Sequence, residues 1–150
     1  MQGALTFETI SYRHFFFLLR LRNLKSSRKW FINPNRVNVF EHLVWFRRLI
    51  RESQSIYLVS KVDGIRSGFI LLKKGTVGYE ISINVLYEFR KQGVGRALLS
   101  EMEGRARQVG ITALYALVLE SNKASNEFFL SQSFNVFEVG HDTILYQKLL

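Results

Sequence analysis

The segment from Arg90 to Arg96, with the sequence RKQGVGR, combines three bases with two glycines in seven residues. An apolar–polar alternation precedes it and an apolar repeat at helical spacing follows it, which predicts a strand, a glycine turn and a helix. The first amides of a helix have no internal acceptor, and the helix dipole adds partial positive charge there. A phosphate can approach Gly93 and Gly95 closely because glycine has no Cβ. We expect an anion site in which Arg90, Lys91 and Arg96 supply full positive charge.

The elements that must position this segment lie on both sides of it. Tyr79 to Val85 alternate apolar and polar side chains, as a half-buried strand does. Apolar side chains then recur at helical spacing from residue 94 onward. The expected apolar face of this helix consists of Val94, Ala97, Leu98, Met102 and Val109.

The order of the glycines distinguishes this segment from two other nucleotide-binding loops. It lacks the Gly-Lys-Ser/Thr ending of a P-loop, and a dinucleotide-binding fingerprint would need glycine at Leu98. The pattern R-x-x-G-x-G between a strand and a helix instead resembles the acetyl-CoA loop of the GCN5-related N-acetyltransferase (GNAT) superfamily. Asn122 to Phe129, followed by Ser133-Phe134, resembles the family's N-x-x-A-x-x-x-Y…G-F segment. The alternative interpretation is a plain helix start with flexible glycines and solvated charges.

The resemblance implies acetyl-CoA as the co-substrate, because in the GNAT family the loop amides hold the CoA pyrophosphate. In the second segment, the family's asparagine and small residue lie against the pantetheine and phosphate part of the cofactor. For Asn122 the alternative is a helix cap that needs no cofactor. The cofactor-binding residues that the resemblance implies are Ile83, Val85, Arg90, Lys91, Gln92, Gly93, Val94, Gly95, Arg96, Ala97, Asn122, Ser125 and Phe128.

Acetyl transfer to an amine requires a stabilised oxyanion, a base for the ammonium and a proton for the leaving thiolate. The resemblance implies that backbone amides around Asn84 hold the thioester, on a strand that splays from its neighbour. Glu80 is the only carboxylate of this strand, and the resemblance implies it as the base, acting directly or through water. A bulge is common in this strand of the family, so the face that Glu80 occupies stays open. The alternative is that Glu80 is a solvated strand residue.

The proton donor is harder to assign. The usual tyrosine of the family falls at Phe129, which cannot donate a proton. Tyr87 or Tyr115 could substitute, a water could serve, or the thiolate could leave unassisted.

The acceptor is indicated by residues 21–46, LRNLKSSRKWFINPNRVNVFEHLVWF. This stretch resembles a GNAT branch with N-acetyltransferases for nucleotide-linked amino sugars, and the same branch contains acetyltransferases for ribosomal-protein N-termini. We expect a small-molecule acceptor, the amino group of a nucleotide-linked amino sugar, with Arg22, Asn23, Arg28 and Trp30 on the acceptor side. A protein N-terminal acetyltransferase and a non-catalytic acyl-CoA-binding module are the alternatives.

The whole chain predicts the element order β-α-α-β-β-β-α-β-α-β-β, which is the GNAT order from end to end. Alternation and turn residues place strands at 5–10, 55–61, 65–73, 77–85, 113–119, 134–139 and 143–148. Helices are expected at 12–23, 39–53, 94–109 and 122–132. We therefore expect an α/β (α+β) GNAT fold in a single domain, residues 1–150. Its mixed, mostly antiparallel sheet of about seven strands should be flanked by four helices.

Some local expectations concern burial. The stretch 22–35 should be irregular, and residues 113–119 should form a buried central strand. His42 is expected at the surface or its boundary. The helix around it should begin at a capping box of Asn38 and Glu41, and its apolar face should consist of Val39, Leu43, Phe46 and Ile50.

Composition limits the number of domains, the compartment and the classes of partner. The chain has 150 residues, 47% of them hydrophobic, and a net charge of +9, which fits one globular domain with polyanionic partners. It has no cysteine, which excludes thiolate chemistry and suits a reducing, cytoplasmic compartment. The longest apolar run near its start, Phe15 to Leu19, is too short to span a membrane. We expect a monomer or homodimer, with no metal and no specific nucleic-acid partner.

Overall fold

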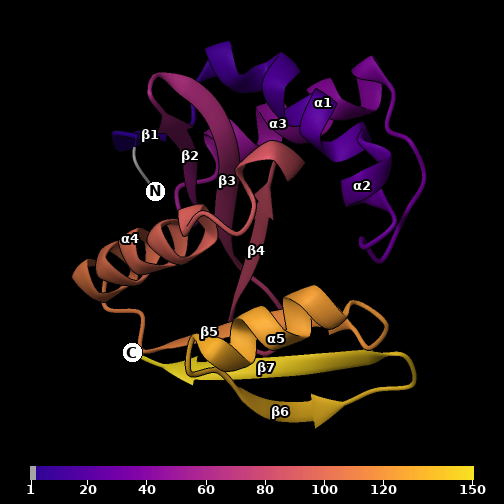
Figure 1. Ribbon diagram of the computed structural model, residues 1–150, viewed down its shortest axis with the longest axis vertical. Helices are drawn as coiled ribbons and strands as arrows, with labels where there is room; N and C mark the ends of the chain where they lie inside the picture. Colours follow the sequence, from indigo (N-terminus) through magenta and orange to yellow (C-terminus); the bar gives the residue numbers. More distant parts are fainter. Residues whose placement is uncertain (1–2) are drawn as a thin grey trace.

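The computed structural model describes residues 3–150, which form one seven-stranded sheet in the order β1-β2-β3-β4-β5-β7-β6 (Figure 1). The pairing of β4 with β5 is parallel, and the other five pairings are antiparallel. The strands are β1 (Leu5–Thr9), β2 (Ile56–Val62), β3 (Ile65–Lys74), β4 (Tyr79–Val85), β5 (Ala113–Leu119), β6 (Asn135–Val139) and β7 (Thr143–Leu149). The predicted fold class and the seven strands are confirmed.

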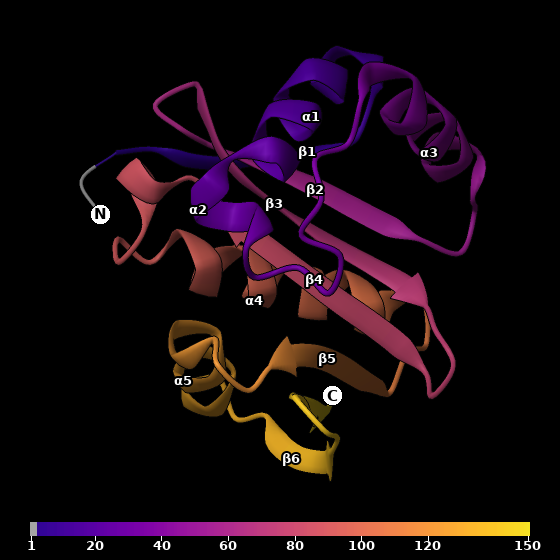
Figure 2. The same cartoon turned by 90° about the vertical axis from the view of Figure 1, so that its right-hand side faces the viewer.

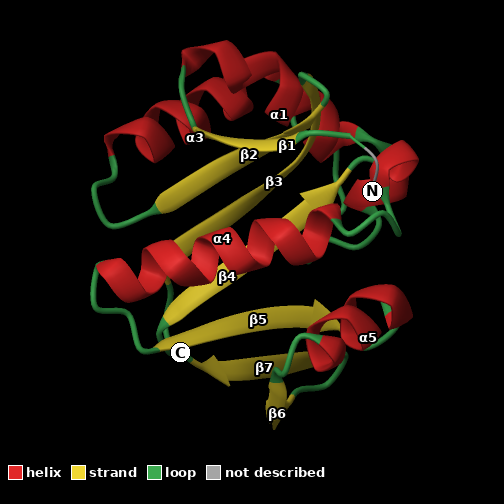
Figure 3. Cartoon of the chain, turned by 60° about the vertical axis from the view of Figure 1, so that its left-hand side comes forward, coloured by secondary structure: helices red, strands yellow, loops and turns green. Residues whose placement is uncertain are grey.

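Helices cover the two faces of the sheet. The α-helices are α1 (Phe15–Asn23), α2 (Lys25–Arg28), α3 (Val39–Arg51), α4 (Val94–Gln108) and α5 (Lys123–Ser131), with short 3₁₀ turns η1 (Tyr12–His14) and η2 (Tyr87–Phe89). Figure 2 shows α1, α2 and α3 on one side of β2–β4 and α4 on the other. Figure 3 shows α4 and α5 side by side in front of the sheet. The expectation of four helices was wrong within the described residues, because the four-residue α2 lies in the stretch predicted to be irregular.

Two hydrophobic cores follow from this layering, because alternate residues of each central strand point to opposite faces. The core on the side of α4 and α5 includes Leu58, Ile70, Ile81, Leu98, Met102, Leu114 and Tyr146. The core on the side of α1 and α3 includes Phe17, Leu21, Phe46, Leu49, Val59 and Leu71.

Helix α3 buries a different face from the one that the sequence predicted. His42 is only 2% exposed and its Nε2 lies 3.0 Å from Phe15 O, whereas Val39 is 57% exposed. A neutral imidazole donates there, because a carbonyl oxygen can only accept. The buried residues of α3 are His42, Phe46 and Leu49. The surface assignment of His42 was therefore wrong.

Two further expectations about burial were also wrong. Val109 is 64% exposed beyond the end of α4, so the last turn of that helix is held by Ala106 instead. Leu117 on β5 is 49% exposed, because no helix among residues 3–150 covers the second face of β5 as α1 and α3 cover that of β2–β4. β5 is thus a central strand with only one buried face.

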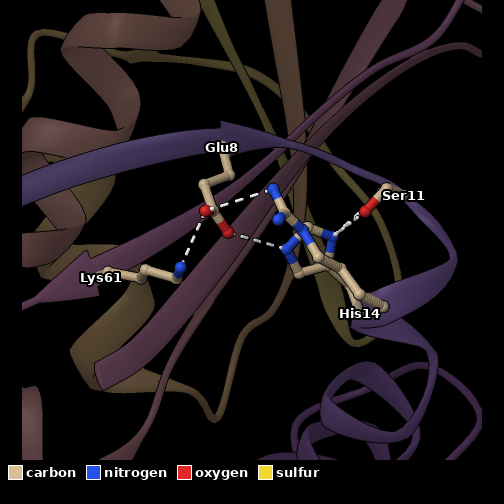
Figure 4. A network of polar contacts seen from close by, with 5 residues as sticks. Glu8, Ser11, His14 and Lys61 are labelled. Carbon is tan, nitrogen blue, oxygen red and sulfur yellow. Dashed lines mark hydrogen bonds and ion pairs between the residues drawn. The ribbon is translucent and has the colours of Figure 1, made fainter. Parts of the chain in front are cut away.

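A polar network fastens β1 to its neighbours (Figure 4). The Ser11 amide donates to His14 Nδ1 at 3.0 Å, so the imidazole is neutral and its Nε2 donates to Glu8 at 3.0 Å. Glu8 also accepts from Lys61 at 2.7 Å and from Arg13 at 3.3 Å. The Lys61 and His14 hydrogen bonds lower the pKa of Glu8 from 4.5 to about 2. Burial lowers the pKa of His14, against the opposing effect of its bond to Glu8.

Candidate active site

The N-terminus of α4 leaves backbone donors open. Its first intrahelical bond is donated by the Ala97 amide to Gly93 O at 3.0 Å. Within residues 3–150, the Gly95 and Arg96 amides donate to no acceptor outside the helix, and no side chain caps it. Gly93 has φ +84° with nothing within 4 Å of the position of a Cβ. The glycine therefore permits a left-handed turn and leaves open space in front of the helix.

Positive charge gathers at this helix end without any acid to balance it. The first turn of α4 contains no acidic residue and does contain the exposed Arg96. Lys91 is exposed with φ +58°, and the side-chain amide of Gln92 donates to Glu88 O. Arg90 has a different role, because its Nε donates to Val85 O at 2.8 Å and closes the turn between β4 and α4. The N-terminus is the positive end of the helix dipole, so a base in the first turn adds to the positive charge there. This terminus therefore suits an anionic ligand.

The edge of β4 next to this helix end is also open. β4 pairs with β5 only at Tyr79–Leu114 and Glu80–Tyr115, and no further pair of these strands exists within the described residues. The Leu86 amide donates to Ser67 O on the β3 side. Because backbone groups alternate along an antiparallel strand, those of Ile83 and Val85 face away from β3, into the gap. The predicted splay of this strand is confirmed.

Three predicted cofactor-binding residues from separate elements meet beside the gap. A Cβ on Gly95 would lie 3.4 Å from the Phe128 ring of α5 and 3.9 Å from Ile83 Cδ1 of β4. Gly95 thus keeps α4 close to α5 and β4. The structure brings the glycine loop, the second motif and the open strand edge into one place.

Asn122 and Ser125 face each other at the start of α5. Asn122 Oδ1 accepts from the Ser125 amide at 3.3 Å, and Asn122 Nδ2 donates to Ser125 Oγ at 2.9 Å. Asn122 is buried and serves as the helix cap. Its predicted contact with the cofactor stays a prediction.

β4 keeps a regular register with β3 from Tyr79 to Val85, so the bulge that the family resemblance suggested does not occur. Alternation therefore places Glu80 and Asn84 on the face opposite the core residue Ile81, which lies toward α4. Asn84 Oδ1 accepts from the buried Ser27 of α2 at 3.2 Å. Ser27 was missed in the sequence, because a small polar residue in a four-residue helix leaves no periodic signal.

Glu80 lies where β4 and β5 part. It forms the last pair of the two strands with Tyr115, and paired residues of adjacent strands point to the same face. The Glu80 carboxylate lies against Gly75 in the β3–β4 turn. The Tyr115 hydroxyl accepts from Gln147 Nε2 at 2.8 Å, which leaves its own proton free to donate.

Phe129, at the position of the family's tyrosine, is a core residue that is only 4% exposed. Its ring packs edge-on against Phe134 at 5.0 Å and stacks with Tyr146 at 6.2 Å. The Tyr146 hydroxyl donates to Asn126 at 2.8 Å, and burial raises the pKa of Tyr146. The site therefore needs another proton donor or none.

The residues predicted on the acceptor side have two different roles. Arg22 donates to Asn33 O at 2.7 Å, and the Asn23 side chain both donates to Val37 O and accepts from Val37 N. These two side chains clamp the loop after α2. Arg28 and Trp30 are half-buried in that region, with Lys29 Nζ 4.7 Å from the Trp30 ring.

Residues 20–134 match the model of the acetyltransferase (GNAT) family. The chain belongs to the GNAT family. This membership confirms the predicted enzyme class, an acetyl-CoA-dependent N-acetyltransferase.

Solved structures share the GNAT fold along the full chain. A domain from Methanocaldococcus jannaschii is 18% identical with a TM-score of 0.87, covering 99% of this chain and 100% of that one. A ribosomal-protein-alanine N-acetyltransferase from Brucella melitensis is 22% identical with a TM-score of 0.83, covering 97% and 99%. YncA, a putative acetyltransferase from Salmonella typhimurium solved with acetyl-CoA, is 21% identical with a TM-score of 0.81, covering 99% and 95%. No curated protein matches the chain.

Among residues 3–150, no group of three or more His, Asp or Glu side chains is arranged to hold a metal ion. No helix in the same range has the length and apolar character needed to cross a membrane.

Proposed function

We propose that this protein transfers the acetyl group of acetyl-CoA to the primary amine of a nucleotide-linked amino sugar, and that residues 1–150 form one catalytic domain. The observation that carries the proposal is the uncapped, base-rich N-terminus of α4 beside the open edge of β4. A pyrophosphate offers acceptor oxygens and negative charge to such a helix end. An extended arm offers amide groups to an unpaired strand edge.

In this proposal the CoA pyrophosphate binds the amides of α4, and Lys91 and Arg96 balance its charge. The pantetheine arm lies in the gap and bonds the backbone groups of Ile83 and the amide of Val85. Phe128 and Ser125 border this arm from α5, in keeping with the contact between Gly95 and the Phe128 ring. Arg90 supports the site indirectly by holding the Val85 carbonyl.

The chemistry takes place at the closed end of the gap, where Glu80 accepts a proton from the acceptor ammonium. The free amine attacks the thioester carbon, so a C–N bond forms and the oxyanion is held by an amide of β4. The C–S bond then breaks, CoA leaves as a thiolate, and the new amide nitrogen loses its remaining extra proton to water. Tyr115 is the better supported of the two tyrosines as its proton donor, because Tyr115 pairs with Glu80 while Tyr87 lies beyond the far end of β4.

The acceptor would bind on the face of β4 that carries Glu80 and Asn84. The hydrogen bond between Ser27 and Asn84 supports this location, because it sets α2 and the following loop beside the open part of β4. Arg28 would bind a diphosphate of the acceptor through paired donors, and Trp30 would stack on its base. Arg22 has one guanidinium nitrogen buried without a partner among the described residues, and burial lowers its pKa.

The Glu80→Gln variant tests the catalytic part. We expect kcat at neutral pH to fall roughly 10²–10⁴-fold with little change in the affinity for acetyl-CoA. The loss should shrink at high pH, where the amine is free without a base. A Glu138→Gln variant, which makes the same change at an exposed carboxylate of β6, is the control. A Glu80→Gln enzyme with the parent's rate at every pH would move the base to water or to another residue.

The Arg28→Ala variant tests the acceptor. The KM for a nucleotide-linked amino sugar should rise while that for acetyl-CoA stays constant, and Arg20→Ala on α1 should change neither. The second candidate, acetylation of protein N-termini, predicts turnover of peptides alone, and that result would remove the sugar as the acceptor. Binding of CoA without turnover of any amine would contradict the catalytic proposal itself.

A further inference from the structure

The positive charge of the chain is concentrated in one part of the fold. Residues 12–52 contain ten bases and two acids, a net charge of +8 out of +9 for the whole chain. This range includes α1, α2 and α3. The predicted anion site at α4 lies outside it, so CoA does not account for this excess.

The same part of the fold exposes large apolar side chains on α1, α3 and η1. Phe16 is 74% exposed and Phe40 is 73% exposed, far more than core side chains of their size. We name these residues the α1/α3 patch: Tyr12, Phe16, Phe40, Leu43, Val44 and Trp45. Contiguous exposed apolar side chains rimmed by polar residues mark an interaction surface.

Ring contacts join three of the exposed aromatic side chains to one cluster of rings, in which Tyr12 lies 6.1 Å from the buried Phe46. Phe16 lies edge-on against Phe15 at 5.1 Å, and Trp45 lies 5.2 Å from the His42 ring. Phe15 and His42 in turn are 4.7 Å apart. Figure 1 shows α1 and α3 together at one end of the molecule, away from β6 and β7. Tyr12, Phe16 and Trp45 therefore border one cluster of rings, and the rest of the patch lies with Trp45 on α3.

The outer side of α3 continues from apolar to basic side chains. Phe40, Val44, Arg47 and Arg51 follow one another at helical spacing on its exposed side. Among residues 3–150, Arg47, Arg48 and Arg51 form no salt bridge with a carboxylate. α3 thus combines an exposed apolar half with an unneutralised basic half.

Three kinds of partner could cover the α1/α3 patch, and they differ in how well they match its apolar and basic side chains. A second copy would bring a second set of the same arginines to one interface across a two-fold axis, which adds like charge there. A nucleic acid would neutralise the arginines but would bury Leu43 and Val44 against phosphates and sugars. An anionic lipid surface offers negative headgroups for arginine and an apolar layer beneath them for aromatic and aliphatic side chains.

We propose that the α1/α3 patch docks this protein on an anionic lipid surface. The apolar side chains enter the boundary between headgroups and acyl chains, while the arginines stay at the level of the headgroups. No helix of the described residues crosses the bilayer. This inference does not depend on the acceptor of the acetyl group, and the α4 terminus lies on the other face of the sheet (Figure 2).

Co-sedimentation with vesicles tests the proposal, using phosphatidylcholine alone and phosphatidylcholine with about 30% phosphatidylglycerol. The parent should bind the anionic vesicles and not the neutral ones. The Arg47→Glu/Arg51→Glu variant should partition at least about 25-fold less, since each basic residue contributes about fivefold near an anionic surface. Phe40→Ser should partition about tenfold less, because it removes a buried aromatic side chain.

Two matched variants serve as controls. Val139→Ser removes an exposed apolar side chain of β6, and Arg107→Glu reverses an exposed base at the far end of α4. Neither Val139→Ser nor the patch variants should change acetyl-CoA binding, which reports that each protein is folded.

Three outcomes would overturn the proposal. One is the absence of binding to anionic vesicles. Another is binding that Arg47→Glu/Arg51→Glu abolishes and Phe40→Ser leaves intact, with competition by single-stranded RNA, which would identify a polyanion site. The third is self-association in light scattering that Phe40→Ser abolishes while vesicle binding persists unchanged.

Discussion

Two helices of this protein begin in opposite ways. α3 starts at Asn38, whose side chain accepts from the Glu41 amide at 2.8 Å while Glu41 accepts from the Asn38 amide at 2.9 Å. α4 starts at Gly93, which has no side chain, and its first turn contains a base and no acid. The capping box makes the start of α3 a poorer anion site, because the Glu41 amide already has an acceptor and the Glu41 carboxylate offsets the helix dipole.

The contrast shows how a fold can keep a binding site open without losing the helix. α4 buries five side chains, Val94, Leu98, Leu99, Met102 and Ala106, so packing stabilises it even with an unsatisfied terminus. α3 packs on the sheet through one side with three buried residues, fewer than α4 has. Its cap therefore adds stability that its packing does not supply. A helix end lacking a cap on a well-buried helix is therefore informative about function.

The sharpest test is to close α4 with a side chain of its own. Gly93→Asp should weaken acetyl-CoA binding about 100-fold or more, because a carboxylate would occupy the helix end and repel the pyrophosphate. Calorimetry measures the affinity. Gly64→Asp is the matched control, since Gly64 has φ +80° and equally open surroundings in the β2–β3 turn. Unchanged affinity in Gly93→Asp would refute the assignment of this loop.

The buried histidines and Glu8, which bond within the chain, should make the free energy of unfolding depend on pH. Burial lowers the pKa of His14 and of His42, so the unfolded chain binds more protons below pH 6.5 and stability is lost as pH falls. Each histidine contributes a slope of up to about 1.4 kcal/mol per pH unit. Glu8, whose pKa is lowered to about 2, adds a loss as pH falls from 4.5 toward 2.

The variants His14→Gln and His42→Gln should each flatten the upper part of this dependence. Urea unfolding at a series of pH values measures the slope. The same slope in the double variant and in the parent would mean that neither histidine is held neutral by the fold.

The capping box should matter for stability alone. Asn38→Ala should lower the free energy of unfolding by about 1 kcal/mol and leave acetyl-CoA affinity unchanged. Asn35→Ala, in the exposed loop before α3, is the control. An effect of Asn38→Ala on CoA binding would show that the two helix ends are not independent.

The smallest expected effect is that of Arg96→Ala, which should raise stability but weaken acetyl-CoA binding. Arg96→Ala should raise the stability of the ligand-free protein by about 0.3 kcal/mol, because it removes a base from a helix N-terminus. The same change should weaken acetyl-CoA binding a few-fold. Arg107→Ala, in the last turn of the same helix, should instead lower stability and leave CoA binding alone. A loss of stability in Arg96→Ala would contradict an unfavourable dipole contact.

The sequence was sufficient to predict elements whose hydrophobic periodicity runs for many residues and turns that contain glycine. The strand meander of β2, β3 and β4 follows from alternation and from Asp63-Gly64, where the structure has φ +50° and +80°. The loop before α4 could be predicted because its glycines and charged residues are identified by residue type alone. Both signals are local, so no tertiary contact was needed to interpret them.

The errors lie where tertiary contacts decide. α3 carries two apolar stripes, and only contact with Phe15 selects the one that contains His42. Asn23 and Ser27 have their partners 14 and 57 residues away, which a sequence pattern does not show. Ser133 has φ +66° where the family motif has glycine, a left-handed conformation that the sequence analysis did not predict.

The meeting of β4 and β5 at two residue pairs has a consequence for amide exchange. The sheet consists of two leaves, β1–β4 and β5–β7, and the backbone groups of Ile83 and Val85 at their seam have no strand to protect them. Their amide protons should exchange with solvent far faster than those of Ser82 and Asn84, which bond to β3. A ligand lying in the seam would act as the missing strand and slow this exchange, so protection at two amides reports occupancy of the gap.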